Sequence, residues 1–329
     1  MKYDYLGKSG LKVSKLCLGT MNFGPYTSKE EAFKIMDRAL EVGINFFDTA
    51  DTYGHFEDGH PGRTERIIGE WFKQGEGRRE KVVLATKVYC ETDNLYEGIN
   101  NERGLSAYKI RRHFHDSLKR LNTDHIELYQ MHHIDRHVSW DEIYEVYGSL
   151  INQGLIDYMG SSNFAARHLV EAQYEAKKRN YLGLVCEQHK YNLLCRYPEL
   201  EVIPAAKKYG IGIIVWGPLD GGLLSGKILK TDNNSERLKK ESKRLTATQR
   251  KQLEAFSKLC KEIGQKEAHV ALAWVLKNPA VTSVIIGPRT LEQFNDTLKV
   301  LEIDLSKETM QRLDEIFPGF DEAPEAYAW

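Results

Sequence analysis

The sequence has few cysteines and no long apolar run. Its 329 residues contain five cysteines, which are scattered and include no Cys-x-x-Cys pair. An odd number of dispersed cysteines argues against a disulfide framework and a structural zinc site, so we expect a reducing, cytoplasmic setting and no metal. No apolar stretch approaches the ~20 residues that a membrane helix requires. The polar start, MKYDYLGKSGLKV, lacks the apolar core of a signal peptide.

A large net charge of either sign is also absent. Lys and Arg total 46 and Asp and Glu total 47, so the formal net charge is −1. Such a chain has no global field that attracts nucleic acid or an anionic membrane. We therefore expect neither as a partner, and any phosphate-bearing ligand must be held by local groups.

What the sequence does contain is a series of apolar runs of strand length, each followed by a segment with helical periodicity. The eight runs are residues 15–19, 44–50, 81–88, 125–133, 156–163, 183–191, 210–219 and 282–289. They show little polar alternation, which is typical of parallel strands covered on both faces. Eight similar units without a break in composition favour a (β/α)₈ TIM barrel, as a single domain over 1–329, rather than a doubly wound open sheet.

Further segments lie before and after these units. Residues 1–14 are expected to form a β-hairpin that turns at 8–10 and plugs one end of the barrel. Extra helices are expected at 246–263 and 306–317, and a tail follows at 318–329.

Two connections, 89–105 and 220–245, are longer than simple loops and are expected to be functional or mobile. The helical stretch RRHFHDSLKRL, residues 111–121, carries so many charges that we interpret it as solvated surface.

Serines mark the expected starts of three helices. Ser28 and Ser139 each precede a glutamate, Glu31 and Glu142, at the spacing of a capping box. Ser106 is the candidate N-cap of the helix that ends near residue 121.

Polar or aromatic residues lie at the predicted C-terminal ends of seven strands. They are Asp48, Lys87, His132 with His133, Ser162 with Asn163, Gln188, Trp216 and Arg289. The C-terminal rim is the catalytic face of barrels of this kind. The positions therefore predict an active site at this rim.

Four of the residues near this rim form a chemically coherent set: Asp48, Tyr53, Lys87 and His132. A free tyrosine is a weak acid with a pKa of about 10, and a neighbouring ammonium lowers that pKa. Asp48 can hold Lys87 charged and in place, and His132 can orient a carbonyl oxygen. The set supplies a proton donor and a positive field to an oxygen that gains negative charge. Carbonyl reduction needs both when a cofactor provides hydride.

Taken singly, these residues have ordinary structural roles in turns, surfaces or cores, and only the combination favours catalysis. Three motif-based alternatives are set aside. GGLLSGKI, residues 221–228, resembles a phosphate-binding loop, but Ile228 stands where Ser or Thr would bind magnesium. His132 and His133 are adjacent on a predicted strand, so they are expected to point to opposite faces and not to share a metal. No G-x-G-x-x-G follows a strand, which argues against a Rossmann site.

Eight short motifs, in order along the chain, match one known family. They are GTMNFG (19–24), FFDTADTYG (46–54), ATKV (85–88), YQMHHID (129–135), GSSNF (160–164), EQHKYNLL (187–194), WGPLDGGLLSGK (216–227) and IIGPRTLEQF (285–294). Over nearly its whole length the chain resembles the aldo-keto reductase superfamily, in the bacterial and plant-type branch that also includes potassium-channel β-subunits.

The resemblance implies a catalytic tetrad of Asp48, Tyr53, Lys87 and His132, with Tyr53 as general acid. It also implies a nicotinamide cofactor that lies extended across the barrel mouth. The cofactor-binding positions that it implies are Gly19, Thr20, Met21, Asp48, Ser162, Asn163, Gln188, Trp216, Gly217, Pro218, Leu219, Gly221, Leu223, Lys227, Gly287, Arg289 and Gln293.

Within this set the resemblance assigns parts of the cofactor to parts of the rim. Ser162, Asn163 and Gln188 would contact the carboxamide, and Trp216 would stack on the nicotinamide. Residues 217–227 would cover the pyrophosphate.

Arg289 and Gln293 would hold the adenosine end. A guanidinium suits a 2′-phosphate, which favours NADP(H) over NAD(H). The sequence departs from the family pattern at Gly217, where a serine is common. It departs again at Asp296 and Thr297, where Glu and Asn are common.

The resulting hypothesis is NADPH-dependent reduction of aldehydes and ketones to alcohols, with a small-molecule carbonyl as substrate. The expected substrate pocket includes Phe23, Tyr26, Tyr89 and His133. One alternative is a slow-turnover NADPH-binding redox sensor or partner subunit. A lesser one is a Schiff-base aldolase that uses Lys87. The sequence leaves the oligomeric state open.

Overall fold

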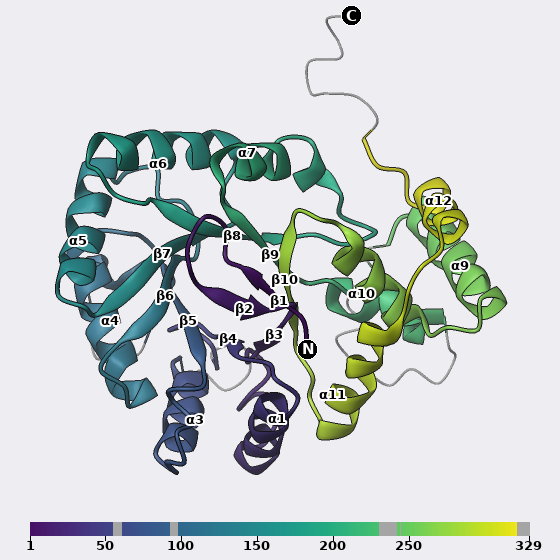
Figure 1. Ribbon diagram of the computed structural model, residues 1–329, viewed down its shortest axis with the longest axis horizontal. Helices are drawn as coiled ribbons and strands as arrows, with labels where there is room; N and C mark the ends of the chain where they lie inside the picture. The colour runs from purple at the N-terminus through teal and green to yellow at the C-terminus, as the bar shows by residue number, and fades with distance from the viewer. Residues whose placement is uncertain (55–60, 93–97, 230–241, 244, 321–329) are drawn as a thin grey trace, which may run out of the picture.

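Eight parallel strands form a closed barrel in the computed structural model, which describes residues 1–54, 61–92, 98–229, 242–243 and 245–320 (Figure 1). The barrel strands are β3 (Leu16–Gly19), β4 (Phe46–Asp48), β5 (Val83–Val88), β6 (Ile126–Met131), β7 (Ile156–Ser162), β8 (Leu184–Lys190), β9 (Gly212–Trp216) and β10 (Val281–Ile286). They follow one another around the barrel in chain order. The seam is closed by β10 pairing with β3, with Val284 opposite Leu16. The predicted (β/α)₈ barrel is confirmed, and only β10 begins outside its predicted run, one residue early.

Helices surround the strands in a ring (Figure 1). Those that follow the barrel strands are α1 (Lys29–Glu41), α3 (Arg63–Phe72), α4 (Ala107–Leu121), α5 (Trp140–Asn152), α6 (Ala166–Lys178), α7 (Val202–Tyr209), α10 (Glu267–Lys277) and α11 (Leu291–Leu298). The predicted extra helices are present as α9 (Ala247–Glu262) and α12 (Lys307–Ile316), which pack together through Phe256 and Phe317. Among the described residues no helix combines the length and apolar character needed to cross a membrane.

Short 3₁₀ turns occupy several connections. They are η2 (Ile99–Asn101), η3 (Tyr197–Glu199), η4 (Asp220–Ser225), η5 (Lys227–Leu229) and η6 (Lys299–Glu302). Parts of both long connections, 93–97 and 230–241 with 244, lie outside the described residues, as does 321–329 of the predicted tail.

The three predicted N-cap serines each accept a hydrogen bond from the third residue of their helix, as expected. The two glutamates of the predicted capping boxes, however, cap neighbouring helices. Glu31 of α1 accepts the amide of Leu291 at the start of α11 at 2.7 Å. Glu142 of α5 accepts the amide of Ala107 at the start of α4, also at 2.7 Å. These acids therefore stabilise contacts around the ring, which spacing along one helix does not reveal.

An antiparallel hairpin, β1 (Tyr3–Tyr5) with β2 (Lys12–Ser14), lies across the N-terminal ends of the strands. Its Leu6 and Val13 are fully buried in an apolar cluster inside the barrel, together with Cys17, Phe46, Ala85, Leu128, Val185, Cys186 and Ile214. Gly7 has φ 56°, and a Cβ there would approach the carbonyl oxygens of residues 185 and 210 within 2.6 Å. The glycine therefore permits the hairpin turn to approach the strand ends closely.

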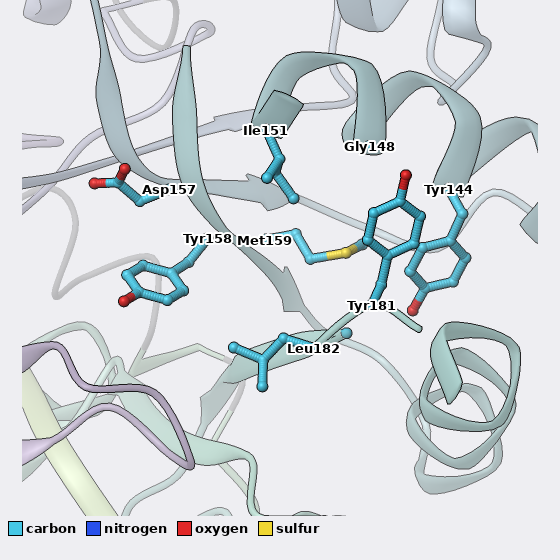
Figure 2. A pocket seen from close by; sticks show the side chains of 9 residues that line it. Tyr144, Gly148, Ile151, Asp157, Tyr158, Met159, Tyr181 and Leu182 are labelled. Carbon is cyan, nitrogen blue, oxygen red and sulfur yellow. The ribbon is translucent and has the colours of Figure 1, made fainter. Parts of the chain in front are cut away.

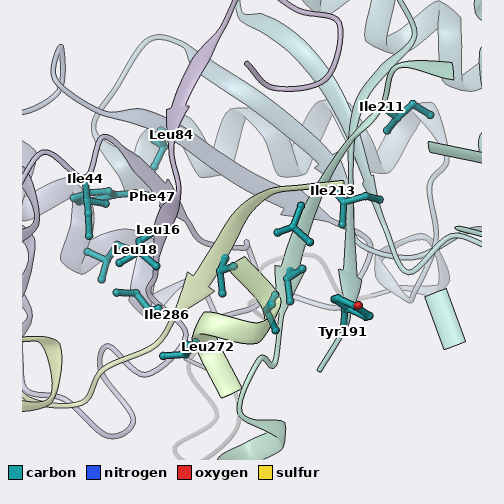
Figure 3. Packing of buried hydrophobic residues seen from close by; sticks show 14 of the residues in the cluster. Leu16, Leu18, Ile44, Phe47, Leu84, Tyr191, Ile211, Ile213, Leu272 and Ile286 are labelled. Carbon is teal, nitrogen blue, oxygen red and sulfur yellow. The ribbon is translucent and has the colours of Figure 1, made fainter. Parts of the chain in front are cut away.

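A larger apolar core lies between the strands and the helices. Outward-facing strand residues such as Leu18, Phe47 and Ile213 pack against helical residues such as Leu272 (Figure 3). The Phe47 ring stacks on Trp71 of α3 with centroids 5.7 Å apart. Close packing of this kind fixes the strand ends, and so fixes the side chains at the C-terminal rim.

The interpretation of residues 111–121 as solvated surface is wrong for one side of α4. His113, Phe114, Ser117 and Leu121 are buried against the barrel. Their spacing of one, three and four residues places them on one side of the helix, which faces the barrel. The charged residues lie mainly on the opposite, more exposed side. Charge content alone hid the buried side.

Candidate active site

Four side chains meet at the C-terminal rim. Asp48 ends β4, Lys87 lies one residue before the end of β5, Tyr53 follows β4 in a turn, and His132 follows β6. The Lys87 ammonium donates to Asp48 Oδ2 at 2.6 Å and to Tyr53 Oη at 3.1 Å. The Tyr53 and His132 rings meet edge to face with centroids 5.9 Å apart. The structure therefore brings together the four residues that the sequence predicted as a set.

All three N–H donors of Lys87 have an acceptor. The third acceptor is the carbonyl oxygen of Thr49, at 2.8 Å. Lys87 is fully buried, and Tyr53 is 9% exposed. Because Tyr53 Oη accepts the bond from Lys87, its own proton remains available for another acceptor. The phenol can therefore be a proton donor toward the barrel mouth.

The Asp48 carboxylate is held by residues that sequence reasoning did not assign to it. Its Oδ1 accepts from Gln130 Nε2 at 3.1 Å and from Gln188 Nε2 at 2.7 Å. Gln130 lies on β6 two residues after Leu128, which belongs to the apolar cluster inside the barrel, so its side chain points to the same side of the strand. A fully buried polar residue within a strand, close to the end that precedes a candidate catalytic residue, was the available signal.

Burial changes the proton affinities at this site. It raises the pKa of Tyr53 above its usual value, and the nearby charge of Lys87 opposes this rise without cancelling it. The expectation of a net lowering is therefore wrong for the protein without ligands, because desolvation of a phenolate outweighs one ammonium. Burial alone would lower the pKa of Lys87, but Asp48 and Tyr53 raise it above its ordinary value. Lys87 is thus an ammonium and Tyr53 a neutral phenol at neutral pH.

His132 is neutral at physiological pH. Burial, followed by the charges of Lys87 and His133, holds its pKa well below its usual range. Its Nδ1 is buried and has no hydrogen-bond partner in the part of the chain that the structure describes. A bare nitrogen is less costly there than an unpaired N–H, which favours the tautomer protonated on Nε2.

The expectation that His132 and His133 point to opposite faces is wrong. Their rings stack with centroids 5.2 Å apart and planes 11° apart. β6 ends at Met131, so the alternation of a strand no longer applies to the two histidines. Within the described ranges, no group of three or more His, Cys, Asp or Glu is arranged to hold a metal ion.

The remaining rim residues lie on a separate arc of the barrel. Ser162 and Gln188 are paired across β7 and β8, Trp216 ends β9, and Gly19 ends β3 beside β10. Apart from Asp48 on β4, the predicted cofactor positions thus lie on or just after five neighbouring strands, from β7 through β10 to β3. The tetrad residues lie on or just after β4, β5 and β6.

The β7 end of this arc has the hydrogen-bonding groups that a carboxamide requires. Asn163 has φ 61°, and its amide donates to the carbonyl oxygen of His132 and to Ser162 Oγ. Trp216 Nε1 donates to Asn163 Oδ1 at 3.1 Å, which fixes the indole at the rim. Hydroxyl, amide and flat aromatic groups together fit a nicotinamide ring and its carboxamide.

The segment after Trp216 continues through η4 and η5, and η4 lies against α10. Gly217 and Gly221 have φ values of 62° and 68°, which a side chain would disfavour. Leu223 is buried and Lys227 is exposed. Lys190 pairs with Asp220 at 2.5 Å and stabilises the start of this turn.

The end of the arc that was predicted to hold the adenosine is organised around Arg289. Its amide donates to Gln293 Oε1 at 3.0 Å, and its carbonyl oxygen accepts from Thr27 Oγ1 at 3.0 Å. Its guanidinium lies over the Tyr26 ring, 4.2 Å from the centroid. Asn22 Nδ2 donates to the Gly287 carbonyl oxygen at 2.8 Å. The loop after β3 therefore supports this end.

Two residues expected in the substrate pocket lie elsewhere. Phe23 is completely buried, because the loop turns its ring into the apolar core under α1. Tyr26 is 37% exposed but stacks on Arg289, away from the tetrad. The other two do lie together at the mouth, since the Tyr89 ring meets His133 edge to face at 5.3 Å.

A small hollow lies away from the C-terminal rim, between α5 and the starts of β7 and β8 (Figure 2). It is lined by Tyr144, Gly148, Ile151, Asp157, Tyr158, Met159, Tyr181, Leu182 and Gly183. The Tyr144 hydroxyl is already bonded to the Ala172 carbonyl oxygen. Its lining lacks a paired acid and base, and we regard it as a packing hollow.

Comparisons with known proteins agree with this geometry. The family model of the aldo/keto reductase family matches residues 15–317. An uncharacterized oxidoreductase of Bacillus subtilis, YrpG, is 59% identical over 330 residues and covers 100% of both chains. A probable voltage-gated potassium channel subunit beta of Oryza sativa is 30% identical, covering 99% of this chain and 100% of its own. A putative aryl-alcohol dehydrogenase of Saccharomyces cerevisiae, AAD16, is 30% identical over 96% of each. The chain belongs to the aldo/keto reductase family of oxidoreductases.

Proposed function

We propose that the protein reduces aldehydes and ketones to alcohols with NADPH, using Tyr53 as the proton donor. The observation that carries this proposal is the hydrogen bond from the buried Lys87 ammonium to Tyr53 Oη, with Asp48 on the other side of the ammonium. This arrangement leaves the phenol proton free and places positive charge beside the oxygen that loses it. Those are the requirements of a general acid in carbonyl reduction.

The roles of the chain's own residues follow from the site. A bound reduced nicotinamide supplies hydride to the carbonyl carbon. Tyr53 gives its proton to the carbonyl oxygen, and Lys87 stabilises the phenolate that remains. His132 donates from Nε2 to the same oxygen and orients it. Gln130 and Gln188 keep the Asp48 carboxylate against Lys87.

Turnover of a carbonyl panel tests this proposal. With NADPH in excess, steady oxidation of the cofactor by several aldehydes, over many turnovers per protein molecule, is the expected result. One turnover or fewer per bound cofactor would instead favour the slow redox sensor or partner subunit. That alternative has support in the likeness to a probable potassium channel subunit beta.

The Schiff-base aldolase is disfavoured by the state of Lys87. A Schiff base needs an amine lone pair, but the Asp48 and Tyr53 partners keep Lys87 protonated. Its three hydrogen bonds also hold it away from substrate.

Arg289→Ala should weaken NADPH binding more than NADH binding. The planar guanidinium, held over Tyr26, suits a 2′-phosphate that only NADPH carries. Loss of a charge-assisted hydrogen bond, worth about 1.5–3 kcal/mol, corresponds to about a 10- to 100-fold rise in the NADPH dissociation constant. Fluorescence titration with both cofactors measures the difference. Arg250→Ala on α9 provides a surface control, and equal weakening of both cofactors by Arg289→Ala would contradict the assignment.

The pH profile of reduction should be flat across neutrality. Burial holds the pKa of His132 well below its usual range and raises the pKa of Tyr53 above its usual value, so neither group changes charge between about pH 7 and 9. The active form needs neutral His132 and protonated Tyr53, so kcat/KM falls only at more acidic pH or above about pH 10. Initial rates in overlapping buffers with a non-ionising aldehyde provide the test. A full inflection near pH 6.5 that persists in His133→Gln would show that His132 titrates normally.

A further inference from the structure

Two buried residues of α4, Lys109 and His113, contact the backbone and side chains around the tetrad without belonging to it. They are four residues apart, so they lie on the same side of the helix. Each is 2% exposed. Both side chains carry polar groups, so their burial requires hydrogen-bond partners.

Lys109 fixes the connection that follows β5. Its ammonium donates to the carbonyl oxygens of Cys90 at 2.8 Å, Asn101 at 3.0 Å and Glu102 at 2.5 Å. All three N–H donors are therefore used on backbone oxygens from two parts of one connection. Burial lowers the pKa of Lys109, and the negative charge of Asp51 opposes this. The ammonium thus links residues 101 and 102 to residue 90, which follows the C-terminal end of β5, the strand that carries Lys87.

His113 joins the same connection to the turn that carries Tyr53. Its Nδ1 contacts Asp51 Oδ2 at 2.8 Å, and its Nε2 contacts Asn101 Oδ1 at 3.0 Å. Asp51 is fully buried, lies two residues before Tyr53, and donates its amide to the Lys87 carbonyl oxygen. One imidazole therefore bridges the Tyr53 turn and η2.

The far end of this connection is tied to the substrate side of the rim. The Gly104 amide donates to the Tyr89 carbonyl oxygen at 3.0 Å, and the Leu105 amide donates to Asp135 Oδ2 at 2.9 Å. Partial burial and then the charge of Arg103 lower the pKa of His133, which stacks on His132. Residues 98–105, the loop segment, are therefore tied to the connections that follow β5 and β6, which carry Tyr89 and His133.

We propose that Lys109 and His113 are positioning residues that hold the loop segment against the Tyr53 turn, so that the segment forms one wall of the substrate site. Lys109 holds only the loop segment in place. His113 holds the loop segment through its contact with Asn101, and it holds the Tyr53 turn through its contact with Asp51. The kinetic part of this inference rests on the proposed carbonyl reduction, and the structural part does not.

Variants can separate the two contacts of His113. The side-chain amide of asparagine lies near the position of Nδ1, so His113→Asn keeps a hydrogen-bond donor for Asp51 and loses the contact with Asn101. The amide of glutamine reaches the position of Nε2, so His113→Gln keeps the contact with Asn101 and loses the contact with Asp51. Lys109→Met removes the three backbone contacts at nearly constant length. Lys119→Met and His115→Asn, on the exposed side of the same helix, are the matched controls.

The expected results differ between the wall and the turn. Lys109→Met and His113→Asn should raise KM for aldehydes about tenfold with kcat within about threefold of wild type, and more strongly for bulky aldehydes. His113→Gln should lower kcat about tenfold with a smaller change in KM, because Tyr53 is held less well. Both controls should behave as wild type. A uniform loss of stability without this split of KM and kcat would overturn the proposal.

Hydrogen exchange gives a readout that does not depend on activity. Amides of the loop segment, including Gly104, should exchange faster in Lys109→Met and His113→Asn, while those of β5 and β6 stay protected. If Lys109→Met does not fold, Asn101→Ala removes the loop side of the His113 contact from a partly exposed position and should raise KM about threefold. Unchanged exchange in these variants refutes the inference. A wild-type protein that reduces no carbonyl refutes the proposed function instead, and exchange still decides the positioning roles.

Discussion

Replacing Tyr53 by phenylalanine is expected to abolish carbonyl reduction, with kcat at least ~10³-fold lower than wild type. The substitution removes one hydroxyl, which is both the acceptor of the Lys87 bond and the proposed proton donor. Without it the developing alkoxide has no acid beside it. Stopped-flow or steady-state oxidation of NADPH with a reactive aldehyde measures the loss.

The same variant should still bind cofactor. Apart from Asp48, the proposed cofactor positions lie on the β7–β10–β3 arc and do not include Tyr53, so the NADPH dissociation constant should remain within about twofold. Tyr174→Phe removes a phenol from the exposed side of α6, where the side chain is 61% exposed, and should behave as wild type. Reduction by Tyr53→Phe at a rate near that of wild type would transfer the acid role to another group.

Lys87→Met is expected to damage both stability and catalysis. It leaves the 2%-exposed Asp48 without its cationic partner, and breaking a buried pair in this way costs about 3–5 kcal/mol of unfolding free energy. Loss of the charge beside Tyr53 should lower kcat by about 10²–10³-fold. Urea denaturation and single-turnover kinetics measure the two effects separately.

A second substitution distinguishes the two losses. In Lys87→Met with Asp48→Asn, the unpaired carboxylate becomes a neutral amide that Gln130 and Gln188 can still contact. Unfolding free energy should recover by a few kcal/mol relative to Lys87→Met alone, while kcat should not recover. Recovery of both would mean that Lys87 acts only by stabilising the fold.

The barrel could be predicted from sequence because its strands are short, apolar and regularly spaced. Prediction from charge content fails where one side of a helix is buried and the other is exposed. Helix α4 is an example, because the buried His113 is flanked in sequence by charged residues. Periodicity also fails for contacts between elements, such as the Glu31 bond to the first amide of α11. Such contacts depend on how helices pack around the ring, which local spacing does not encode.

The four tetrad positions could be predicted because each lies at or just beyond a strand end. Their supporting residues were harder to find, since Gln130 and Asp51 resemble ordinary polar positions until the strands are side by side. Side-chain directions in loops were the least predictable, as Phe23 and Tyr26 illustrate. The net effect of burial on Tyr53 likewise requires the complete surroundings of the phenol.

The seam between β10 and β3 has a consequence for how the chain is made on the ribosome. Ser283 Oγ donates to the carbonyl oxygen of Ser14, its partner 269 positions earlier, and β10 pairs along β3. A nascent chain that stops before β10 exposes two open strand edges, which invite pairing with other chains. Arg289 emerges only after that last strand. A growing polypeptide therefore closes the barrel and positions Arg289 at its rim only after β10 has been made.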